Sequence, residues 1–287
     1  MKFHIITAMY NVEEWIEENI QSIKDQSFKN FQVVLVDDMS TDRTVELIKN
    51  AIQDDNRFQL IINKEKKFKT RNVVEAINAS NPDDDDIIIL VDGDDRLASK
   101  EILKKLIDTY QSQNCWMTYG SYANNEGIRS KNCYPYDINT IKENSFREKK
   151  WIASHLKTFK YKLWKKLDMN IFHITDNEIH KALIRSLMKL QFRYWYHWKD
   201  IKAKDLHDIS GKYIKRIDDK AFSYPMLEIS GDNACFIEEI LYIFNTERAP
   251  YKGPDQNYGK NKSEKWHTRL IRDVLVHKTK YKRLKQL

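Results

Sequence analysis

Short apolar runs alternate along the first third of the chain with segments whose apolar residues recur at helical spacing. The runs cover residues 3–8, 31–36, 58–62 and 87–91. Because they show little polar alternation, they predict strands buried on both faces, as in the middle of a parallel sheet. The segments between them, which predict helices, are residues 12–23, 43–52 and 73–77. This order predicts an α/β fold with a central, mostly parallel sheet flanked by helices.

Acidic residues crowd the ends of two of these runs. Asp37-Asp38 ends the second run, and Asp92, Asp94 and Asp95 follow the fourth. In open α/β sheets, ligands lie beyond the carboxyl ends of the strands. Gathered carboxylates repel one another unless a cation lies among them, and Mg²⁺ and Mn²⁺ prefer such oxygen ligands. The alternative is a solvated Asp-Gly turn with no ligand.

The rest of the chain is less regular. A helix at 100–110 and a strand at 116–119 are expected before a loop-rich stretch at 120–151. A further strand is expected at 236–244. The polar loop that follows it, residues 245–259, could cover the site as a lid. We expect residues 1–120 and 121–259 to form two halves of the same domain. The basic tail, 260–287, either docks on an anionic membrane or packs on the domain, and packing is favoured.

Composition excludes several classes of protein. With 287 residues, 41% of them hydrophobic, the chain can bury one substantial core. A net charge of +7 suits nucleic acid, an anionic membrane or a phosphorylated substrate, but the basic residues form no aromatic-interleaved platform, so no nucleic acid partner is expected. No segment approaches the roughly 20 apolar residues of a membrane span. The chain start also lacks a signal-peptide core, which predicts a cytoplasmic protein, with peripheral membrane contact through the tail as an option.

The cysteines give a separate indication. Cys115, Cys133 and Cys235 are odd in number and far apart in the sequence, so neither a disulfide framework nor a zinc site is expected. A reducing compartment is the simplest interpretation.

Three motifs carry a resemblance to a known family. Thr7-Ala8-Met9-Tyr10-Asn11, Val36-Asp37-Asp38-Met39-Ser40-Thr41-Asp42 and Val91-Asp92-Gly93-Asp94-Asp95 occur in this order, each at the end of a predicted strand. The chain thereby resembles the family-2 glycosyltransferases of the GT-A fold, including their Asp-x-Asp metal motif. Met39 departs from the pattern, because glycine is usual there, and this bears on the geometry of the turn.

The resemblance implies a donor site for a nucleotide-diphosphate sugar, with a uridine diphosphate (UDP) sugar favoured. Residues 1–120 would then be the nucleotide-sugar-binding half of the domain and residues 121–259 its acceptor-binding half. Mn²⁺ or Mg²⁺ would be held by Asp95 and Asp94, with Asp92 or Asp94 facing the ribose. Asp38 would accept from a uracil-like base. The remaining donor contacts implied by the resemblance are Thr7, Tyr10, Asn11 and Arg71, although Arg71 could also be an exposed surface cation.

Two later segments resemble other parts of the family. Ser154-His155-Leu156-Lys157-Thr158-Phe159 is similar to a Ser-His-Leu-Arg-Thr-Phe segment of some members, which implies that His155 and Lys157 face the diphosphate or the acceptor. The alternative is a histidine packed at the start of a helix. His267 is a weaker candidate for a metal or phosphate ligand.

The last candidates lie in Asp218-Asp219-Lys220-Ala221, which is similar to the segment that opens an acceptor-site helix in the family. An inverting transfer needs a base that takes the proton of the acceptor hydroxyl. Asp219 is the candidate and Asp218 its rival, and helix capping is the structural alternative for both. Glu228 is expected to contact the acceptor.

The resulting expectation is a metal-dependent inverting glycosyltransferase acting on a hydroxyl of a glycan, lipid-linked or protein acceptor. The alternatives are an inactive nucleotide-sugar-binding module and a nucleotidyltransferase-like enzyme. The glycine-rich basic loop of the latter is missing from residues 7–12.

Overall fold

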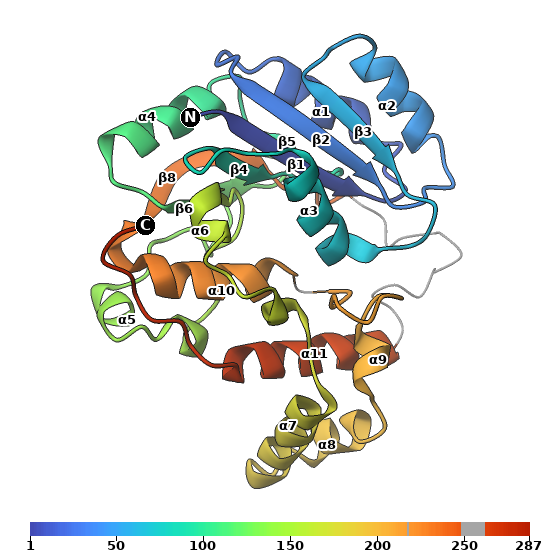
Figure 1. The fold of residues 1–287 in the computed structure, drawn as a ribbon, viewed down its shortest axis with the longest axis vertical. Helices are drawn as coiled ribbons and strands as arrows, with labels where there is room; N and C mark the ends of the chain where they lie inside the picture. The colour runs from blue at the N-terminus through green and yellow to red at the C-terminus, as the bar shows by residue number, and fades with distance from the viewer. Residues whose placement is uncertain (217, 248–261) are drawn as a thin grey trace.

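The computed structural model describes residues 1–216, 218–247 and 262–287. Within them the strands form one eight-stranded sheet in the order β3-β2-β1-β4-β7-β6-β8-β5 (Figure 1). The strands are β1 (Phe3–Met9), β2 (Phe31–Asp37), β3 (Phe58–Ile62), β4 (Ile87–Leu90), β5 (Arg96–Leu97), β6 (Met117–Ala123), β7 (Thr158–Lys160) and β8 (Ala234–Ile243).

The N-terminal half of the sheet is parallel, as its apolar runs predict. β1 pairs with β2 on one side and β4 on the other, and β2 pairs with β3. Every side chain of β4 is buried, as expected for a strand covered on both faces. The helices that alternate with these strands are α1 (Ile16–Lys24), α2 (Thr44–Ile52), α3 (Phe68–Ala79) and α4 (Ile102–Ser112). The predicted α/β architecture is confirmed.

The two faces of the sheet bury different helices. Ile5 of β1 belongs to a core that contains apolar residues of α1, α2 and α4. Its neighbour Ile6 points to the opposite face and packs in a core with α3 and the C-terminal helices. The alternation follows from the pleat of the strand, which sends successive side chains to opposite faces.

The second half of the sheet is mixed. β7 runs antiparallel to both β4 and β6, β6 is parallel to β8, and the short β5 is antiparallel to β8. Its helices are α5 (Ile138–Lys142), α6 (Tyr161–Trp164), α7 (Asp176–Met188), α8 (Phe192–Trp198), α9 (Ala203–Leu206), α10 (Asp218–Ser230) and α11 (Lys262–His277), with 3₁₀ turns η1 (Phe146–Glu148), η2 (Met169–Phe172) and η3 (Gly231–Asn233). The sequence predicted none of α7, α8 and α9.

The basic tail packs back on the domain through α11. The apolar residues on its inner face are buried: Trp266, Leu270, Ile271, Val274 and Leu275. The favoured prediction of packing is therefore confirmed, and this apolar face is not available to a membrane. Of the predicted lid, residues 248–259 lie outside the described residues. Within the described part of the chain, no helix has the length and apolarity to cross a membrane.

Two predictions about the core are wrong. Cys115 and Cys235 form a disulfide with their Cα atoms 5.9 Å apart. They are 120 residues apart in sequence, but Cys115 lies just before β6 and Cys235 is the second residue of the neighbouring β8. The interpretation of a reducing compartment therefore loses its basis. Cys133 is a buried free thiol.

The other error concerns Glu228, which was expected at the acceptor. Its side chain is fully buried and makes a two-point ion pair with Arg147, at 2.5 Å and 2.9 Å. Glu228 also accepts from the backbone N–H of Tyr281 (2.9 Å). It therefore joins α10 to η1 and to the C-terminal segment, and this position explains why it cannot face a substrate.

Candidate functional site

The acidic loop after β4 is held in a fixed turn. The backbone N–H of Asp95 donates to the carbonyl of Asp92 (3.0 Å). From α1, Asn19 donates to the carbonyls of Asp92 (2.9 Å) and Asp95 (2.7 Å). A Cβ atom at Gly93 would lie only 2.7 Å from the Cβ of Met9, so glycine allows the loop to pass close to β1. The turn therefore fixes where its carboxylates point.

Asp95 is buried and bound by residues from the far end of the sheet. Its Oδ2 accepts from the hydroxyl of Tyr242 (2.7 Å) and its Oδ1 from the backbone N–H of Asn245 (2.8 Å). Burial, and then the negative charges of Asp92 and Asp94, raise the pKa of Asp95 to about 8. A nearby cation would favour the charged form of this carboxylate.

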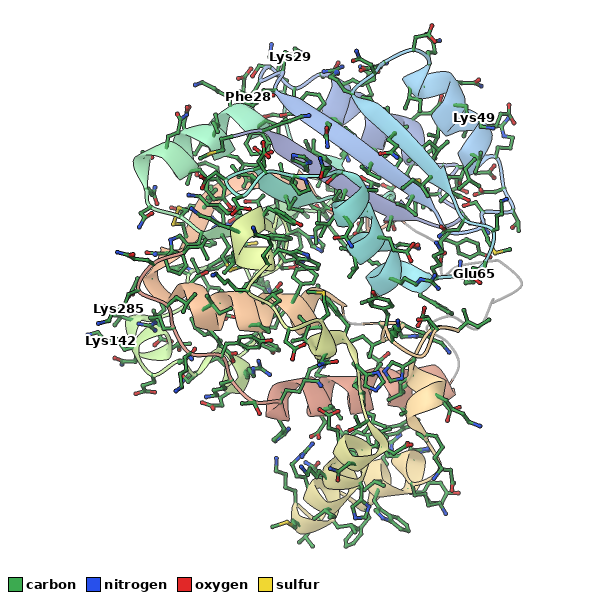
Figure 2. The ribbon with its side chains drawn as sticks, viewed as in Figure 1. Phe28, Lys29, Lys49, Glu65, Lys142 and Lys285 are labelled. Atoms are coloured by element: carbon green, nitrogen blue, oxygen red, sulfur yellow. A yellow bond between two sulfur atoms is a disulfide. The ribbon has the colours of Figure 1, made fainter. Side chains whose placement is uncertain are left out.

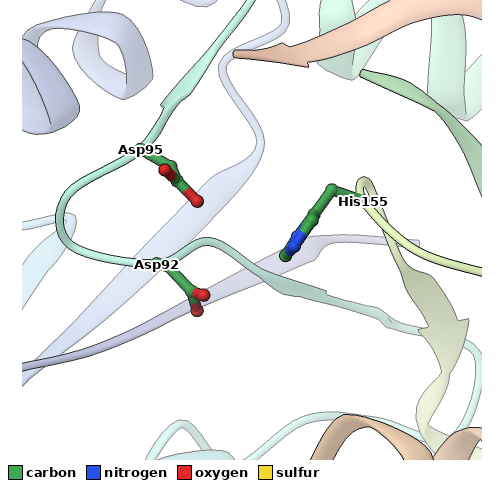
Figure 3. A group of neighbouring side chains, drawn as sticks. All are labelled: Asp92, Asp95 and His155. Atoms are coloured by element: carbon green, nitrogen blue, oxygen red, sulfur yellow. The ribbon is translucent and has the colours of Figure 1, made fainter. Parts of the chain in front are cut away.

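Asp92, Asp95 and His155 form a group of possible metal ligands. One donor atom of each lies within 4.8 Å of the donors of the other two, and Figure 3 shows the three side chains directed toward a common space. The His155 ring stacks on that of Tyr242, with centroids 4.7 Å apart. Burial, and then the charge of Lys157, lower the pKa of His155 to about 3. The imidazole is therefore neutral at physiological pH, as a metal ligand must be.

The donor set fits a divalent cation. Carboxylate oxygens suit Mg²⁺ and Mn²⁺, whereas imidazole favours transition metals. The sequence expectation paired Asp94 with Asp95, but it is Asp92 that shares the group with Asp95 and His155. A metal-binding role for Asp94 stays a prediction. His267 also lies outside this group, and its role is equally untested.

Two lysines place positive charge beside the group. Lys69 of α3 makes an ion pair with Asp92 at 2.6 Å. Burial is the largest single effect on Asp92 and opposes its charge. The charge and hydrogen bond of Lys69, together with the electrostatic effects of His155 and Lys157, outweigh burial and lower the pKa of Asp92 below the usual range. Lys157 is buried, and within the described residues no carboxylate lies within ion-pair distance of it. A buried lysine of this kind can bind an anionic ligand.

Asp38 lies in a cage of donors. Its Oδ1 accepts from Asn63 Nδ2 (3.0 Å) and from the backbone N–H of Lys67 (2.9 Å). Its Oδ2 accepts from the backbone N–H of Phe68 (3.0 Å) and lies 3.5 Å from the ammonium of Lys66. A carboxylate has about four acceptor positions, so the protein itself fills them. A nucleobase N–H would have to replace one of these donors.

The first turn of α3 links Asp38 to the acidic loop. Lys67 and Phe68 donate their backbone N–H groups to Asp38, and Lys69 reaches Asp92. The positive end of a helix favours a nearby carboxylate, which explains the position of Asp38. The two acidic motifs of the sequence therefore belong to one connected site.

The first motif lies against the second. Asn11 donates its backbone N–H to Ser40 Oγ (2.9 Å), and its side chain bonds Thr41. The ring of Tyr10 lies under the ammonium of Lys66. Thr7, in contrast, is fully buried inside β1, so it could meet a donor only after a rearrangement.

Arg71 does not point toward the acidic loop. It makes ion pairs with Glu75 (2.7 Å), Glu65 (3.1 Å) and the buried Asp208 (3.3 Å). A role for Arg71 at the nucleobase or diphosphate stays a prediction. The basic side chain that does reach the loop from the same stretch is Lys69.

Asp219 lies half-buried in the first turn of α10. Its negative charge acts on His155, where it raises the pKa against the larger effects of burial and Lys157. Asp219 therefore lies within electrostatic range of His155. The side chain of its rival Asp218 lies outside the described residues.

The described residues enclose two notable cavities. One, of about 210 Å³, is lined by Asp94, Asp95, Asn125 and Asn245, among others. The other, of about 500 Å³, lies between α10 and the residues that follow α11, and its lining includes none of Asp92, Asp95 and His155. The larger cavity is therefore not the site of the acidic cluster.

The sequence interpretation missed four residues that build the site: Asn19, Lys69, Tyr242 and Asn245. Only Lys69 had a local signal, since it lies in a basic stretch of the sequence. Tyr242 and Asn245 lie in or next to a predicted strand, but their contact with a loop about 150 residues earlier is visible only in the fold.

Known proteins are similar to this chain over part of its length. The chain is 33% identical over 123 residues to an uncharacterized glycosyltransferase of Haemophilus influenzae, covering 42% of this chain and 46% of that protein. It is 36% identical over 108 residues to the poly(ribitol-phosphate) beta-N-acetylglucosaminyltransferase TarS of Staphylococcus aureus, a match that covers 36% of this chain and 18% of TarS. The chain thus spans less than half the length of these relatives.

A solved structure and a family model extend this similarity. Residues 1–349 of S. aureus TarS, in complex with UDP-GlcNAc, match with a TM-score of 0.55 and 18% identity over 94% of this chain and 65% of that one. That likeness confirms the predicted GT-A fold. The model of the family described as Glycosyl transferase family 2 matches residues 4–175, more than half of the chain. On this match, and with the three motifs gathered in one site, the chain belongs to glycosyltransferase family 2.

Proposed function

We propose that this chain transfers a sugar from a nucleotide-diphosphate donor, preferably a UDP-sugar, to an acceptor hydroxyl, with the help of a divalent cation. The observation that carries the proposal is the group formed by Asp92, Asp95 and His155 at the end of β4, next to Lys69 and Lys157. A cluster of metal ligands beside two lysines suits a diphosphate. Family membership supports the same reaction class.

Asp92, Asp95 and His155 would hold Mn²⁺ or Mg²⁺. When bound, the cation would neutralise the charge that develops on the leaving diphosphate. Lys157 would bind the diphosphate directly, because it is buried near His155 and has no carboxylate partner among the described residues. Lys69 would keep Asp92 ionised and orient it, because its ammonium lies 2.6 Å from that carboxylate.

The nucleoside would lie along the first turn of α3. Asp38 would accept a hydrogen bond from an imide N–H of uracil, which would take the place of the Lys66 ammonium. At 3.5 Å, the contact with Lys66 is the longest of the four that Asp38 makes. Tyr10 would then be uncovered for the base or ribose. TarS, whose fold this chain shares, is described in complex with UDP-GlcNAc, which supports uridine as the nucleoside.

Asp219 would act as the base. Its carboxylate would take the proton of the acceptor hydroxyl while that oxygen attacks the anomeric carbon on the side opposite the departing diphosphate. The result is inversion at the anomeric carbon. The position of Asp219 at the start of α10, within electrostatic range of His155, supports this assignment.

The metal assignment is tested by Mn²⁺ titration, followed by calorimetry, of three variants. Asp92→Asn and His155→Gln should weaken Mn²⁺ binding and abolish Mn²⁺-dependent hydrolysis of a UDP-sugar. Asp85→Asn is the matched control, since the exposed Asp85 lies at the other end of β4 and pairs with Lys162. Urea unfolding of each variant checks that the fold is intact. Equal Mn²⁺ affinity in all three variants and the parent would remove the assignment.

The base assignment needs a different readout. Asp219→Asn should retain UDP-sugar binding but lose transfer, by on the order of 10² to 10⁴. The neighbouring Lys220→Gln is the control for disturbance of the helix start. If Asp219→Asn transfers as fast as the parent, the base lies elsewhere. If the parent binds a UDP-sugar and Mn²⁺ but never turns over, the chain is a binding module.

A further inference from the structure

The hairpin formed by α7 and α8 exposes an unusual number of large apolar side chains. We define the hairpin tip as residues 184–196. Its large apolar members have exposed fractions from 38% to 78%: Ile184, Leu187, Met188, Leu190, Phe192 and Tyr196. Single exposed apolar side chains are common on protein surfaces, but several of them in one short segment indicate a binding surface. In Figure 1 the hairpin projects from the end of the molecule opposite the sheet.

The inner side of the hairpin is anchored to α11. Trp198 is buried and donates from its indole N–H to the carbonyl of Trp266 (3.1 Å), and Tyr194 packs edge-on against the Trp266 ring. Arg185 is bound to Asp273. The hairpin is therefore a fixed part of the fold, while the residues of its tip are exposed in the described structure.

Leu190, at the apex, is 74% exposed and has a φ of 54°. A non-glycine residue is strained in this left-handed conformation. Exposure of leucine brings no compensating burial. Folding alone would favour glycine or asparagine here, so an apolar side chain at the apex indicates a binding role.

The charge of the hairpin selects its partner. Residues 179–199 contain no Asp or Glu and five basic residues, of which Lys181 and Lys189 are exposed and have no ion-pair partner among the described residues. Lys199 lies over the rings of Trp195 and Tyr196. Apolar and aromatic side chains interspersed with lysines are typical of elements that lie at the surface of an anionic bilayer.

We propose that the hairpin tip docks on an anionic lipid bilayer, with Met188, Leu190 and Phe192 entering the boundary between headgroups and acyl chains and the lysines contacting lipid phosphates. The tip is a convex projection, which suits a fluid planar surface. Each lysine near an anionic membrane contributes about fivefold to the partition coefficient. This surface replaces the tail, whose apolar face is buried, as the membrane contact. The proposal does not depend on sugar transfer.

The test is co-sedimentation of the full chain with vesicles of phosphatidylcholine, alone or mixed with phosphatidylglycerol. The chain should bind the mixed vesicles and not the neutral ones. Met188→Ser with Leu190→Ser should lose most of this binding, and Lys181→Gln with Lys189→Gln should weaken it more than tenfold. Failure of the chain to bind mixed vesicles would overturn the proposal.

Matched controls distinguish binding through the tip from nonspecific hydrophobic or electrostatic adsorption to the vesicles. Ile128→Ser with Ile138→Ser removes two equally exposed apolar side chains from elsewhere. Lys29→Gln with Lys49→Gln removes two lysines from the opposite end of the molecule (Figure 2). Both pairs should bind vesicles like the parent, and binding that falls equally in all variants would contradict the proposal. Sedimentation velocity tests the remaining alternative, in which the tip joins two copies of the chain. The proposal would be wrong if the parent self-associates without binding vesicles and Met188→Ser with Leu190→Ser abolishes that self-association.

Discussion

The buried ion pair of Arg147 and Glu228 gives a stability prediction that can be worked out from the structure. Arg147 donates to both oxygens of Glu228 and also to the carbonyl of Leu275 (2.6 Å). Both side chains are almost completely inaccessible to water, at 3% and 0% exposed. Glu228→Gln removes the negative charge and leaves a guanidinium buried without a counter-ion.

The expected loss is large for a single substitution. Breaking a buried pair by removing one partner costs about 3 to 5 kcal/mol, because the remaining charge stays desolvated. For a chain of this length the entropy of unfolding is about 0.6 kcal/mol/K, so the midpoint of thermal unfolding should fall by about 5 to 8 °C. The double variant Arg147→Met with Glu228→Leu should recover part of this loss, since it leaves no buried charge.

Urea unfolding followed by tryptophan fluorescence measures the effect. Asp108→Asn is the control, because it breaks an exposed pair with Lys104 (2.8 Å) and should cost no more than about 0.5 kcal/mol. A loss below about 1 kcal/mol in Glu228→Gln would show that water reaches the pair, and the description of a dry ion pair joining α10 to the C-terminal segment would be refuted.

Three further outcomes are expected. Met39 has a φ of 66° and an exposed side chain, so Met39→Gly should raise the free energy of unfolding by about 1 kcal/mol. A lower free energy of unfolding in urea would show that the Met39 backbone is not strained. Burial lowers the pKa of His4, and the charge of Lys2 adds to this effect, although the hydrogen bond with Asp86 (3.0 Å) opposes it. At His4 the folded state therefore binds fewer protons than the unfolded state below about pH 6.5. The contribution of His4 to stability should therefore fall as pH drops from 7 to 5, so the pH profile of unfolding of His4→Gln should fall less steeply, or rise more steeply, than that of the parent. Lys69→Met should raise the KM for a UDP-sugar more than it lowers the kcat for transfer. The control is Lys67→Met, which should leave both constants nearly unchanged because the side chain of Lys67 pairs with Glu75. Identical kinetics in the two variants would exclude Lys69 from the donor site.

The strands and the acidic loop were predictable because their signals are local. An unbroken apolar run such as Ile87–Leu90 specifies burial on both faces by its composition, and the acids that follow it must emerge at the strand end. The hairpin of α7 and α8 was missed for the opposite reason. Its outward side is apolar, so hydrophobic periodicity, which assumes that apolar residues face inward, did not mark it as an element.

Contacts between distant segments could not be predicted from the sequence. The disulfide of Cys115 and Cys235 requires the β6 and β8 neighbours that only the fold defines. The choice of Asp92 over Asp94 within the possible metal group has a similar cause, because both follow the same strand and spacing alone does not say which carboxylate turns toward His155.

The expected division into a donor half, residues 1–120, and an acceptor half, residues 121–259, stays a prediction, but residues from both ranges hold the candidate site. His155 comes from the second half, and the buried Asp95 depends on Tyr242 and Asn245 for both of its hydrogen bonds. The region matched by the family model, residues 4–175, contains all three possible metal ligands but neither of these supports. In a fragment with those bounds, Asp95 would lose both donors and His155 the Tyr242 ring on which it stacks. The possible metal ligands would then be present without the contacts that orient them, so β8 supports the candidate site although none of its residues belongs to the group itself.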